Sequence, residues 1–246
     1  MSDSINIDKK KIINFFKDNK VQIVLTAILF LIILISSFDI RLSNLPLLKD
    51  KTSGKYISTD LDSLYFYREA QTILTNGHLP VVDILRAPVQ NTTWIPETLP
   101  YVLVGLYKVI TLFSPSMTFD YFAAISGPII YGFGLIIFFF LCFLLTKSKT
   151  ASLISVTILA YAPMYLFRTS AGFYDHDHLG VTFLFIFLLV LVLALRKLEN
   201  GYKEAILGGI AIGIATAAVL TSWGGAITFV VAVFPLTCLL YYLIHN

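Results

Sequence analysis

The sequence predicts an all-α protein, a polytopic bundle of about six transmembrane helices. Two observations carry this prediction. The 246 residues are 57% hydrophobic and only 13% charged, whereas roughly a quarter of the residues in a soluble domain are charged. The hydrophobic residues also form runs close to the length of about 20 residues that a spanning helix needs. Most of the chain is therefore expected to lie in lipid or against other apolar helices.

Six hydrophobic runs are the candidate spans of one transmembrane domain over 21–246. They cover residues 21–38, 122–145, 151–167, 179–195, 205–222 and 226–244. A polar and basic segment over 1–20 precedes the first run, which has no small-residue cleavage site, so this run is interpreted as a retained helix. A seventh stretch over 99–113 is shorter, contains Lys108 and is bracketed by prolines.

The basic residues decide whether the 99–113 stretch crosses the membrane, because cytoplasmic loops carry an excess of Lys and Arg. If it does not cross, the basic N-terminus and the basic loops 147–149 and 196–203 all face the cytoplasm, and the acidic loop at 175–177 faces outside. If it crosses, the two basic loops move outside and the acidic loop moves to the cytoplasm, while the N-terminus stays in the cytoplasm. We therefore predict six spans, with a long external loop over 39–121 in which 99–113 is an interfacial helix.

The segment between the third and fourth spans holds the densest group of ionisable residues. Asp175 and Asp177 project from the same side of an extended or turn backbone, and two nearby carboxylates repel unless a cation lies between them. Carboxylate oxygens suit Mg²⁺ or Mn²⁺, and the imidazole of His176 shifts the preference toward Mn²⁺. Arg168 lies beside them at the membrane edge, where a charge is costly. The competing interpretation is a solvated polar turn whose Asp and His residues cap a helix.

A second acidic group follows the first span. Asp60 or Asp62 would cap the helix that comes next and place an anion at its positive end. Capping explains one Asp, but it does not explain why Tyr65, Tyr67 and Arg68 follow so closely. An acid at the membrane surface, backed by aromatic residues and one Arg, suits the binding of a polar group at the lipid boundary.

Trp223 and two glycines join the fifth and sixth spans. A Trp at the membrane interface is common, and paired glycines allow a tight turn or the close approach of a ligand. Together with the two acidic segments, this turn places acids, an Arg and aromatic residues on one face. That arrangement is typical of an active site at the mouth of a helix bundle, and it suits a substrate with a lipid tail.

At these residues the sequence resembles the catalytic subunit of oligosaccharyltransferase, the Stt3/AglB/PglB family, and most of all its archaeal members. The first external loop of the family carries an Asp, then a Tyr, and closes on an Arg, which Asp62, Tyr65 and Arg68 match. The match places Asp62 rather than Asp60 at the family's catalytic Asp. The order, spacing and topology of the motifs agree across nearly the whole chain.

The second acidic motif of the family begins with an Arg, continues through a Gly and an aromatic residue, and ends in two metal-binding side chains. It is matched by Arg168, Gly172, Tyr174, Asp175 and Asp177. A Ser-Trp-Gly-Gly turn often follows the fifth span in this family, and residues 222–225 repeat it. Each motif alone is weak, but their combination is specific.

The resemblance implies the GT-C type membrane fold and transfer of an oligosaccharide from a dolichyl phosphate or diphosphate donor to the asparagine of an Asn-x-Ser/Thr sequon. It also implies Mn²⁺ or Mg²⁺ held by Asp62, Asp175 and Asp177, where the ion stabilises the leaving phosphate. Asp62, which is also implied to contact the acceptor amide, and Arg168, which is implied to orient the cluster or the phosphate, are the implied catalytic residues. The implied substrate-binding residues are Tyr65, Arg68, His176 and Trp223.

The partners implied by the resemblance are a lipid-linked oligosaccharide donor, an acceptor polypeptide with a sequon, and membrane lipids, but no nucleic acid. We expect a multi-pass protein of the cell (plasma) membrane, with its N-terminus in the cytoplasm and its acidic loops outside. Family members continue into further spans, a later loop with a Glu, and a soluble C-terminal domain with a Trp-Trp-Asp-Tyr-Gly motif, which the 246 residues do not contain. The sequence is therefore expected to be an N-terminal portion, inactive without the missing C-terminal half.

Two other functions compete with this interpretation. Another GT-C glycosyltransferase that uses a polyprenyl-phosphate sugar, such as a protein mannosyltransferase, would also place acids in the first external loop. Such enzymes typically have adjacent acids there and lack the later acidic loop and the Ser-Trp-Gly-Gly turn. A transporter would have ionisable residues in mid-span and broken helices, whereas the acids of this sequence lie at the outer ends of the spans.

Overall fold

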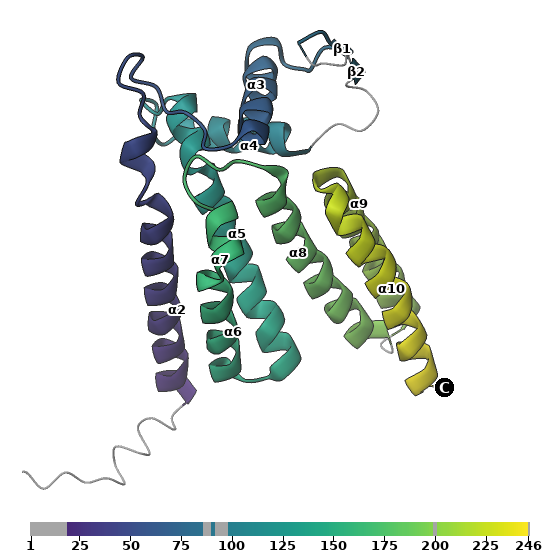
Figure 1. Ribbon diagram of the computed structural model, residues 1–246. Helices are drawn as coiled ribbons and strands as arrows, with labels where there is room; N and C mark the ends of the chain where they lie inside the picture. Colours follow the sequence, from purple (N-terminus) through teal and green to yellow (C-terminus); the bar gives the residue numbers. More distant parts are fainter. Residues whose placement is uncertain (1–18, 86–89, 92–97, 199–200, 246) are drawn as a thin grey trace, which may run out of the picture.

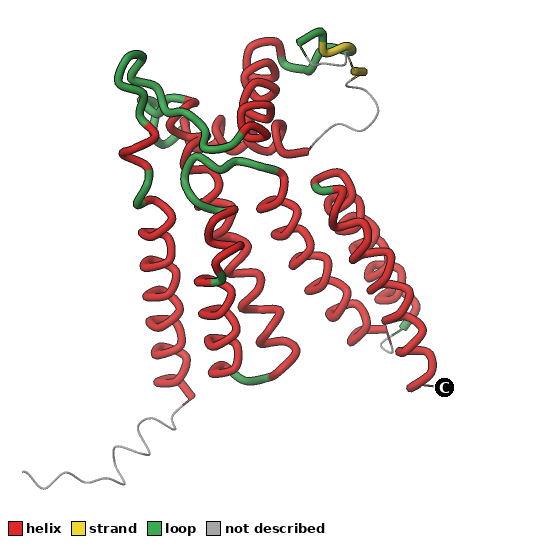
Figure 2. Tube along the Cα trace, viewed as in Figure 1, coloured by secondary structure: helices red, strands yellow, loops and turns green. Residues whose placement is uncertain are grey.

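The computed structural model describes residues 19–85, 90–91, 98–198 and 201–245, so the predicted cytoplasmic N-terminus lies almost entirely outside the described residues. The described chain is mostly helical (Figure 2). The longer helices are α2 (Asn19–Leu42), α3 (Leu61–Asn76), α4 (Thr98–Thr111), α5 (Phe119–Thr146), α6 (Lys149–Tyr161), α8 (His176–Lys197), α9 (Tyr202–Ser222) and α10 (Gly224–His245). The shorter elements are the 3-10 helix η1 (Leu45–Leu48), the helix α7 (Pro163–Arg168) and an antiparallel pair of strands, β1 (Val82–Asp83) and β2 (Gln90–Asn91).

Within the described ranges, 5 helical segments are long and apolar enough to cross a membrane. They are α2 together with η1, α5, α8, α9 and α10, and they run side by side with their ends at similar levels (Figure 1). The predicted fold class, a polytopic transmembrane helix bundle, is confirmed. Helices α3 and α4 lie at one end of the bundle. We call it the cluster end, because the two acidic segments of the sequence lie there, at the starts of α3 and α8. The start of α2 and the turn between α5 and α6 lie at the opposite end (Figure 1).

The predicted third span is not one continuous helix. Helix α6 ends at Tyr161, Ala162 is extended with φ −61° and ψ 122°, and α7 begins at Pro163. The Pro ring disfavours helical backbone in the residue before it and cannot donate the hydrogen bond that would continue α6, although it is well suited to the first turn of a new helix. The chain still passes from the opposite end to the cluster end through α6 and α7 (Figure 1).

The shorter apolar stretch that was predicted to be interfacial forms α4. This helix does not run alongside the long helices but lies at the cluster end next to α3 (Figure 1). One side of α4 is fully buried through Leu99 and Leu103, which belong to the same core cluster as Phe66 and Ala70 of α3. Side chains on its other side, including Tyr101 and Val109, are exposed, as is Phe113 just beyond its C-terminus. A helix with one buried and one uncovered apolar side fits a position at the membrane surface.

The core is divided among three clusters of buried residues. The first hydrophobic cluster joins α3, α4 and α5 and lies beneath the acidic segments of the cluster end. A second cluster joins α8, α9 and α10 around Phe187 and Val219. A third joins α5 and α6 around Tyr131 and Leu135, with side chains of α2 packed against it. The segments that carry the acidic motifs therefore stand on packed helices, which is what a precise site requires.

Candidate functional site

Two segments far apart in the sequence are joined by hydrogen bonds at the cluster end. One is the connection between α7 and α8, and the other leads into α3. The backbone N–H of Thr59 and the hydroxyl of Ser58 both donate to the carbonyl of Gly172, each at 3.0 Å. The backbone N–H of Tyr174 donates to the Ser63 hydroxyl at 3.2 Å. These bonds place the Asp-x-Asp segment of α3 directly beside the acidic start of α8.

Gly172 is required at the centre of this junction. Its φ of +80° lies in the left-handed region that favours glycine. A Cβ at this position would lie 2.6 Å from Cδ1 of Leu48 and 3.1 Å from Cγ2 of Thr59. Its N–H also donates to the carbonyl of Ala124 on α5 at 2.7 Å. The backbone angle therefore strains any other residue at this position, and an added Cβ would also displace the ends of the Leu48 and Thr59 side chains.

A buried arginine fixes the other half of the same connection. Arg41 on α2 is fully buried, and its Nε donates to the Thr169 hydroxyl at 2.7 Å. Its guanidinium also donates to the carbonyl of Ala160 at 3.0 Å and lies 3.5 Å from the ring centroid of Tyr131. The carbonyl of Arg41 accepts a 2.8 Å bond from the N–H of Ala171. Sequence reasoning missed this residue, although an Arg just beyond the end of a predicted span is itself a signal of a polar contact.

Three carboxylates meet where the two segments join. Asp60, Asp62 and Asp175 each have a carboxylate oxygen within 4.8 Å of the others. Among the described residues, these are the acidic, His or Cys side chains that form a group of three close enough together to share a metal ion. Asp175 is 2% exposed, Asp60 is half-buried and Asp62 is exposed. Carboxylates this close repel one another unless a cation offsets their charge. We call these three residues the carboxylate cluster.

Asp60 is a cluster member that the sequence prediction passed over in favour of Asp62. It occupies the N-cap position of α3, but its side chain makes no capping hydrogen bond to the first turn of that helix. Capping, the competing interpretation, therefore does not use this carboxylate, which lies instead with Asp62 and Asp175. The spacing of Asp60 and Asp62, two positions apart like Asp175 and Asp177, was the available signal.

Asp175 is held by its neighbours in the ionised form. It is the N-cap of α8, and its Oδ1 accepts from the N–H of His176 at 2.6 Å and lies 2.6 Å from the His176 Nδ1. Burial by itself would raise the pKa of Asp175, but the hydrogen bonds and charge of His176 outweigh it and lower the pKa below its usual range. The competing interpretation of Asp175 as a helix cap is thus also correct, since the side chain caps α8 and joins the cluster.

Asp177 lies next to the cluster rather than within its group of three. Arg168 Nη1 is 3.0 Å from Asp177 Oδ2 and 3.4 Å from Asp175 Oδ2. His176 Nε2 is 3.6 Å from Asp177 Oδ1. Arg168 and His176 therefore link the two carboxylates of the Asp175–Asp177 motif. The structure brings all the predicted ligands and Arg168 into one neighbourhood, with Asp60 in addition.

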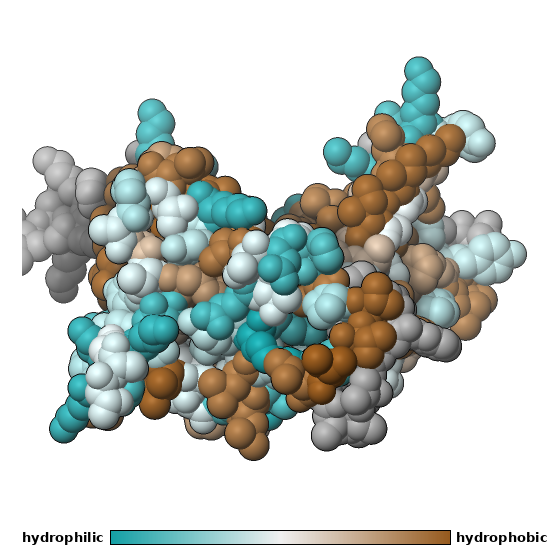
Figure 3. Space-filling view, turned by 90° about the horizontal axis from the view of Figure 1, so that it is seen from above, coloured by the Kyte–Doolittle hydropathy of each residue, from teal (hydrophilic) through white to brown (hydrophobic). Residues whose placement is uncertain are grey.

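The other predicted binding residues, Tyr65, Arg68 and Trp223, contact residues outside the carboxylate cluster. Arg68 forms an ion pair with Asp83 of β1, and Tyr65 donates to Glu69 at 2.5 Å. Trp223 lies under the first turns of α8, so close that a Cβ on Gly180 would be 2.3 Å from the Trp223 Cβ. Seen from above, hydrophilic side chains lie over the middle of the cluster end, with hydrophobic ones beside them (Figure 3).

His178 was not singled out by the sequence. It is 1% exposed, and neither ring nitrogen has a hydrogen-bond partner among the described residues. It lies three positions after Asp175 in the first turn of α8, on the side that packs in the bundle. Burying a polar group without a hydrogen-bond partner costs free energy. The polar groups at the start of α8 therefore include a buried imidazole as well as the acidic residues.

The fold and the cluster define a class of protein: a multi-pass membrane protein with an acidic site at one end of its helix bundle. Comparison with protein families identifies the family. The family described as "Oligosaccharyl transferase STT3, N-terminal" matches residues 23–246, and the chain belongs to it. This membership favours the oligosaccharyltransferase interpretation over the mannosyltransferase and transporter alternatives. A search of the curated proteins gave no match.

Among solved structures, the chain is similar to the oligosaccharyltransferase of Archaeoglobus fulgidus in the apo form, with a TM-score of 0.57 and 19% sequence identity. The similarity covers 79% of this chain but 24% of that one. At this identity the likeness shows the shared fold. The chain thus spans about a quarter of the length of the relative it matches.

Proposed function

We propose that this chain forms the metal-binding and donor-facing part of an oligosaccharyltransferase, a glycosyltransferase of protein N-glycosylation. The enzyme would transfer an oligosaccharide from a dolichyl phosphate or diphosphate to the asparagine of an Asn-x-Ser/Thr sequon. The observation that carries the proposal is the meeting of Asp60, Asp62 and Asp175 within 4.8 Å in a chain of the STT3 family.

The residues of the cluster fit a divalent metal ion. Their carboxylate oxygens are the hard ligands that Mg²⁺ and Mn²⁺ prefer, and the capping position of Asp60 leaves its side chain uncommitted to α3. We assign the ion to Asp62, Asp175 and Asp177, with Asp60 as an added ligand. When bound, the ion would act as a Lewis acid that neutralises charge on the departing phosphate.

In the proposed transfer, the bond from the sugar C1 to the phosphate oxygen breaks and a bond from C1 to the asparagine amide nitrogen forms. The departing phosphate oxygen keeps the electron pair, and the amide nitrogen loses one proton, which that oxygen can accept. Asp62 is the exposed member of the cluster, so its carboxylate is suited to accept a hydrogen bond from the acceptor amide. Arg168 lies within 3.4 Å of both Asp175 and Asp177 and would orient them while adding positive charge near the phosphate.

We assign substrate binding to the residues around the cluster. His176 stacks edge-on against Phe66 at 5.3 Å between ring centroids and borders Asp175 and Asp177. Trp223 supports the start of α8 and would shape the donor site from below. Arg68 is bound to Asp83, so it reaches a phosphate only when that ion pair opens.

We propose that the cluster end faces outward from a cell membrane and that the N-terminus lies in the cytoplasm. The basic residues at both ends of the turn between α5 and α6, and at the end of α8, lie at the opposite end and support this orientation. The lipid-linked donor would then reach the cluster from the outer leaflet. Recognition of the acceptor sequon would be completed by polypeptide outside these 246 residues, since the chain spans 24% of its relative.

Binding of Mn²⁺ to the purified chain in detergent tests the metal site without requiring the complete enzyme. Electron paramagnetic resonance distinguishes free from bound Mn²⁺, and we expect Asp62→Asn and Asp175→Asn to weaken binding at least about tenfold. Asp50→Asn is the matched control, because Asp50 is an acid of the same external region that binds Thr52 and Ser53 instead. Unchanged affinity in both cluster variants would refute the metal site.

Transfer of glycan to a sequon peptide tests the reaction in the complete enzyme that contains this chain. We expect Asp62→Asn and Asp175→Asn to reduce the rate by more than about 100-fold, because each removes a charged ligand of the ion that would stabilise the leaving phosphate. Transfer to a Ser or Thr hydroxyl instead of asparagine would reassign the protein to the mannosyltransferase class.

A further inference from the structure

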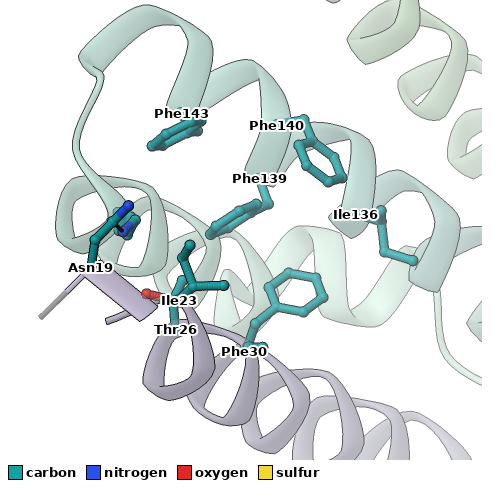
Figure 4. A pocket seen from close by; sticks show the side chains of 10 residues that line it. Asn19, Ile23, Thr26, Phe30, Ile136, Phe139, Phe140 and Phe143 are labelled. Atoms are coloured by element: carbon teal, nitrogen blue, oxygen red, sulfur yellow. Dashed lines mark hydrogen bonds between the residues drawn. The ribbon is translucent and has the colours of Figure 1, made fainter. Parts of the chain in front are cut away.

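A groove runs between α2 and α5 at the opposite end of the bundle, away from the carboxylate cluster. It has a volume of about 660 Å³, and Figure 4 shows aromatic and aliphatic side chains from the two helices facing across it. The lining residues are Asn19, Ile23, Thr26, Ala27, Phe30, Ile136, Phe139, Phe140, Phe143 and Lys149. Most are apolar, Lys149 is the ionisable one among them, and none is acidic.

The length of the groove matches one leaflet of a bilayer. Its α2 residues extend from Asn19 to Phe30, which at 1.5 Å per residue is about 16 Å. Half of a hydrocarbon core of about 30 Å is about 15 Å. At the deep end, Phe30 and Phe139 meet edge to face with their centroids 5.2 Å apart. The groove can therefore accommodate a lipid tail that enters from one membrane surface and ends near the bilayer midplane.

The mouth of the groove is polar and positively charged. Lys149 Nζ donates to Asn19 Oδ1 at 2.6 Å, which uses one of the three donors of the ammonium group. The exposed Lys147 ends α5 just beyond Phe143, and Lys149 is the first residue of α6, whose N-terminus adds a partial positive charge. Basic pockets between transmembrane helices are known sites for anionic lipid head groups.

A second cavity on the same seam shows that the charge is specific to this groove. It has a volume of about 480 Å³ and lies between the halves of α2 and α5 nearer the cluster end. Its lining shares Ile136 with the first groove, but its ionisable residue is Asp39. A carboxylate at this position repels an anionic head group, so the two cavities differ in the sign of charge and not in their apolar walls.

We propose that the α2–α5 groove binds an anionic phospholipid, with one tail lying along Phe139 and Phe140 and ending at Phe30, and with the phosphate beside Lys149. This occupant accounts for the three properties together: apolar walls, a depth of one leaflet and a cationic mouth. The inference is independent of the transferase reaction, because the groove lies at the end of the bundle away from the cluster.

Native mass spectrometry of the detergent-purified chain, delipidated and then exposed to single lipids, tests this site. Phosphatidylglycerol should be retained in preference to phosphatidylcholine with the same tails, and Lys149→Gln should reduce that preference about fivefold. Ala27→Phe, which fills the groove, should reduce retention of both lipids. The matched controls are Lys203→Gln at the start of α9 and Ala211→Phe in the α8–α9 groove, which should behave as wild type.

Two further arms separate the other occupants. Soluble glycerol 3-phosphate should not displace phosphatidylglycerol, because the apolar walls contribute most of the contact; displacement would show a phosphate site without a lipid. In the complete enzyme within membranes, a photoreactive residue at Phe140, which is 53% exposed, should yield lipid adducts. Adducts to another helix instead, or equal retention of the two lipids by the wild-type chain, would overturn the proposal.

Discussion

Hydrogen bonds join chain segments far apart in sequence at both ends of the bundle, but those at the cluster end are buried, whereas those at the opposite end lie at the surface. Arg41, Thr169 and Ser63 illustrate the first kind, because each uses a buried polar atom to hold a specific neighbour. The contact between Lys149 and Asn19 illustrates the second, since it lies at the surface. The difference indicates that geometry is fixed at the cluster end, while the opposite end acts through its charge and shape.

The largest effect is expected from Arg41→Met, which tests whether the buried network determines the cluster end. The change leaves the Thr169 hydroxyl and the carbonyl of Ala160 without their donor, so we expect a loss of about 2–4 kcal/mol in unfolding free energy. Thermal unfolding in detergent measures it. Arg41→Lys should recover part of the loss, and Lys203→Ala should have almost no effect. An Arg41→Met protein as stable as wild type would show that the network is not needed.

Gly172→Ala should have the next largest effect and should act on the site as well as on stability. The added Cβ would meet Leu48 at 2.6 Å at a φ of +80°, so we expect a loss of more than about 1 kcal/mol together with weakened Mn²⁺ binding. Gly77→Ala is the matched control, because Gly77 has φ +83° but nothing within 4 Å of its Cβ. Equal losses of stability in the two variants would mean that space around Gly172 is not limiting.

Asp60→Asn distinguishes the two roles open to an acid at the start of α3. Because its side chain makes no capping hydrogen bond to α3, stability should change by less than about 0.5 kcal/mol. Affinity for Mn²⁺ should nevertheless fall severalfold, since one oxygen ligand of full charge is lost. Isothermal titration with Mn²⁺ and thermal unfolding separate these readouts. A loss of stability with unchanged Mn²⁺ affinity would show that Asp60 caps α3 and does not bind the metal.

The smallest effect on stability is expected from Lys149→Ala at the opposite end. The residue contacts Asn19 at the surface, and such contacts contribute within about 0.5 kcal/mol. Thermal unfolding in detergent free of added lipid is the measurement. A loss comparable to that of Arg41→Met would show that the two ends are built in the same way, and the comparison between them would fail.

The sequence indicated which acidic segments lie together, but not which of their carboxylates lie closest to one another. Asp62, Asp175, Asp177 and Arg168 could be chosen from short motifs, because residues two positions apart in a motif are close in any fold. Whether Asp60 or Asp177 lies nearest to the other segment depends on the hydrogen bonds between Thr59, Gly172 and Tyr174 and their partners. Those bonds join positions more than 100 residues apart, which no local pattern specifies.

The prolines show the same limit within single helices. Pro128 lies inside α5 and Pro235 inside α10, and both helices continue through them. Pro163 instead separates α6 from α7. All three lie in apolar runs of similar composition, so the sequence gives no means of telling an accommodated proline from an interrupting one. The surrounding helices decide whether the lost hydrogen bond can be tolerated.

The sequence by itself determined which stretches are apolar helices and predicted that 99–113 does not cross the membrane, because hydrophobic length and the placement of Lys and Arg are local properties of the chain. Only the tertiary structure decided that Asp60 joins Asp62 and Asp175, that Arg41 is fully buried and hydrogen-bonded to Thr169, and that Lys149 lies at the mouth of an apolar groove. The physical reason is that these features depend on distances between helices, and such distances are set by packing.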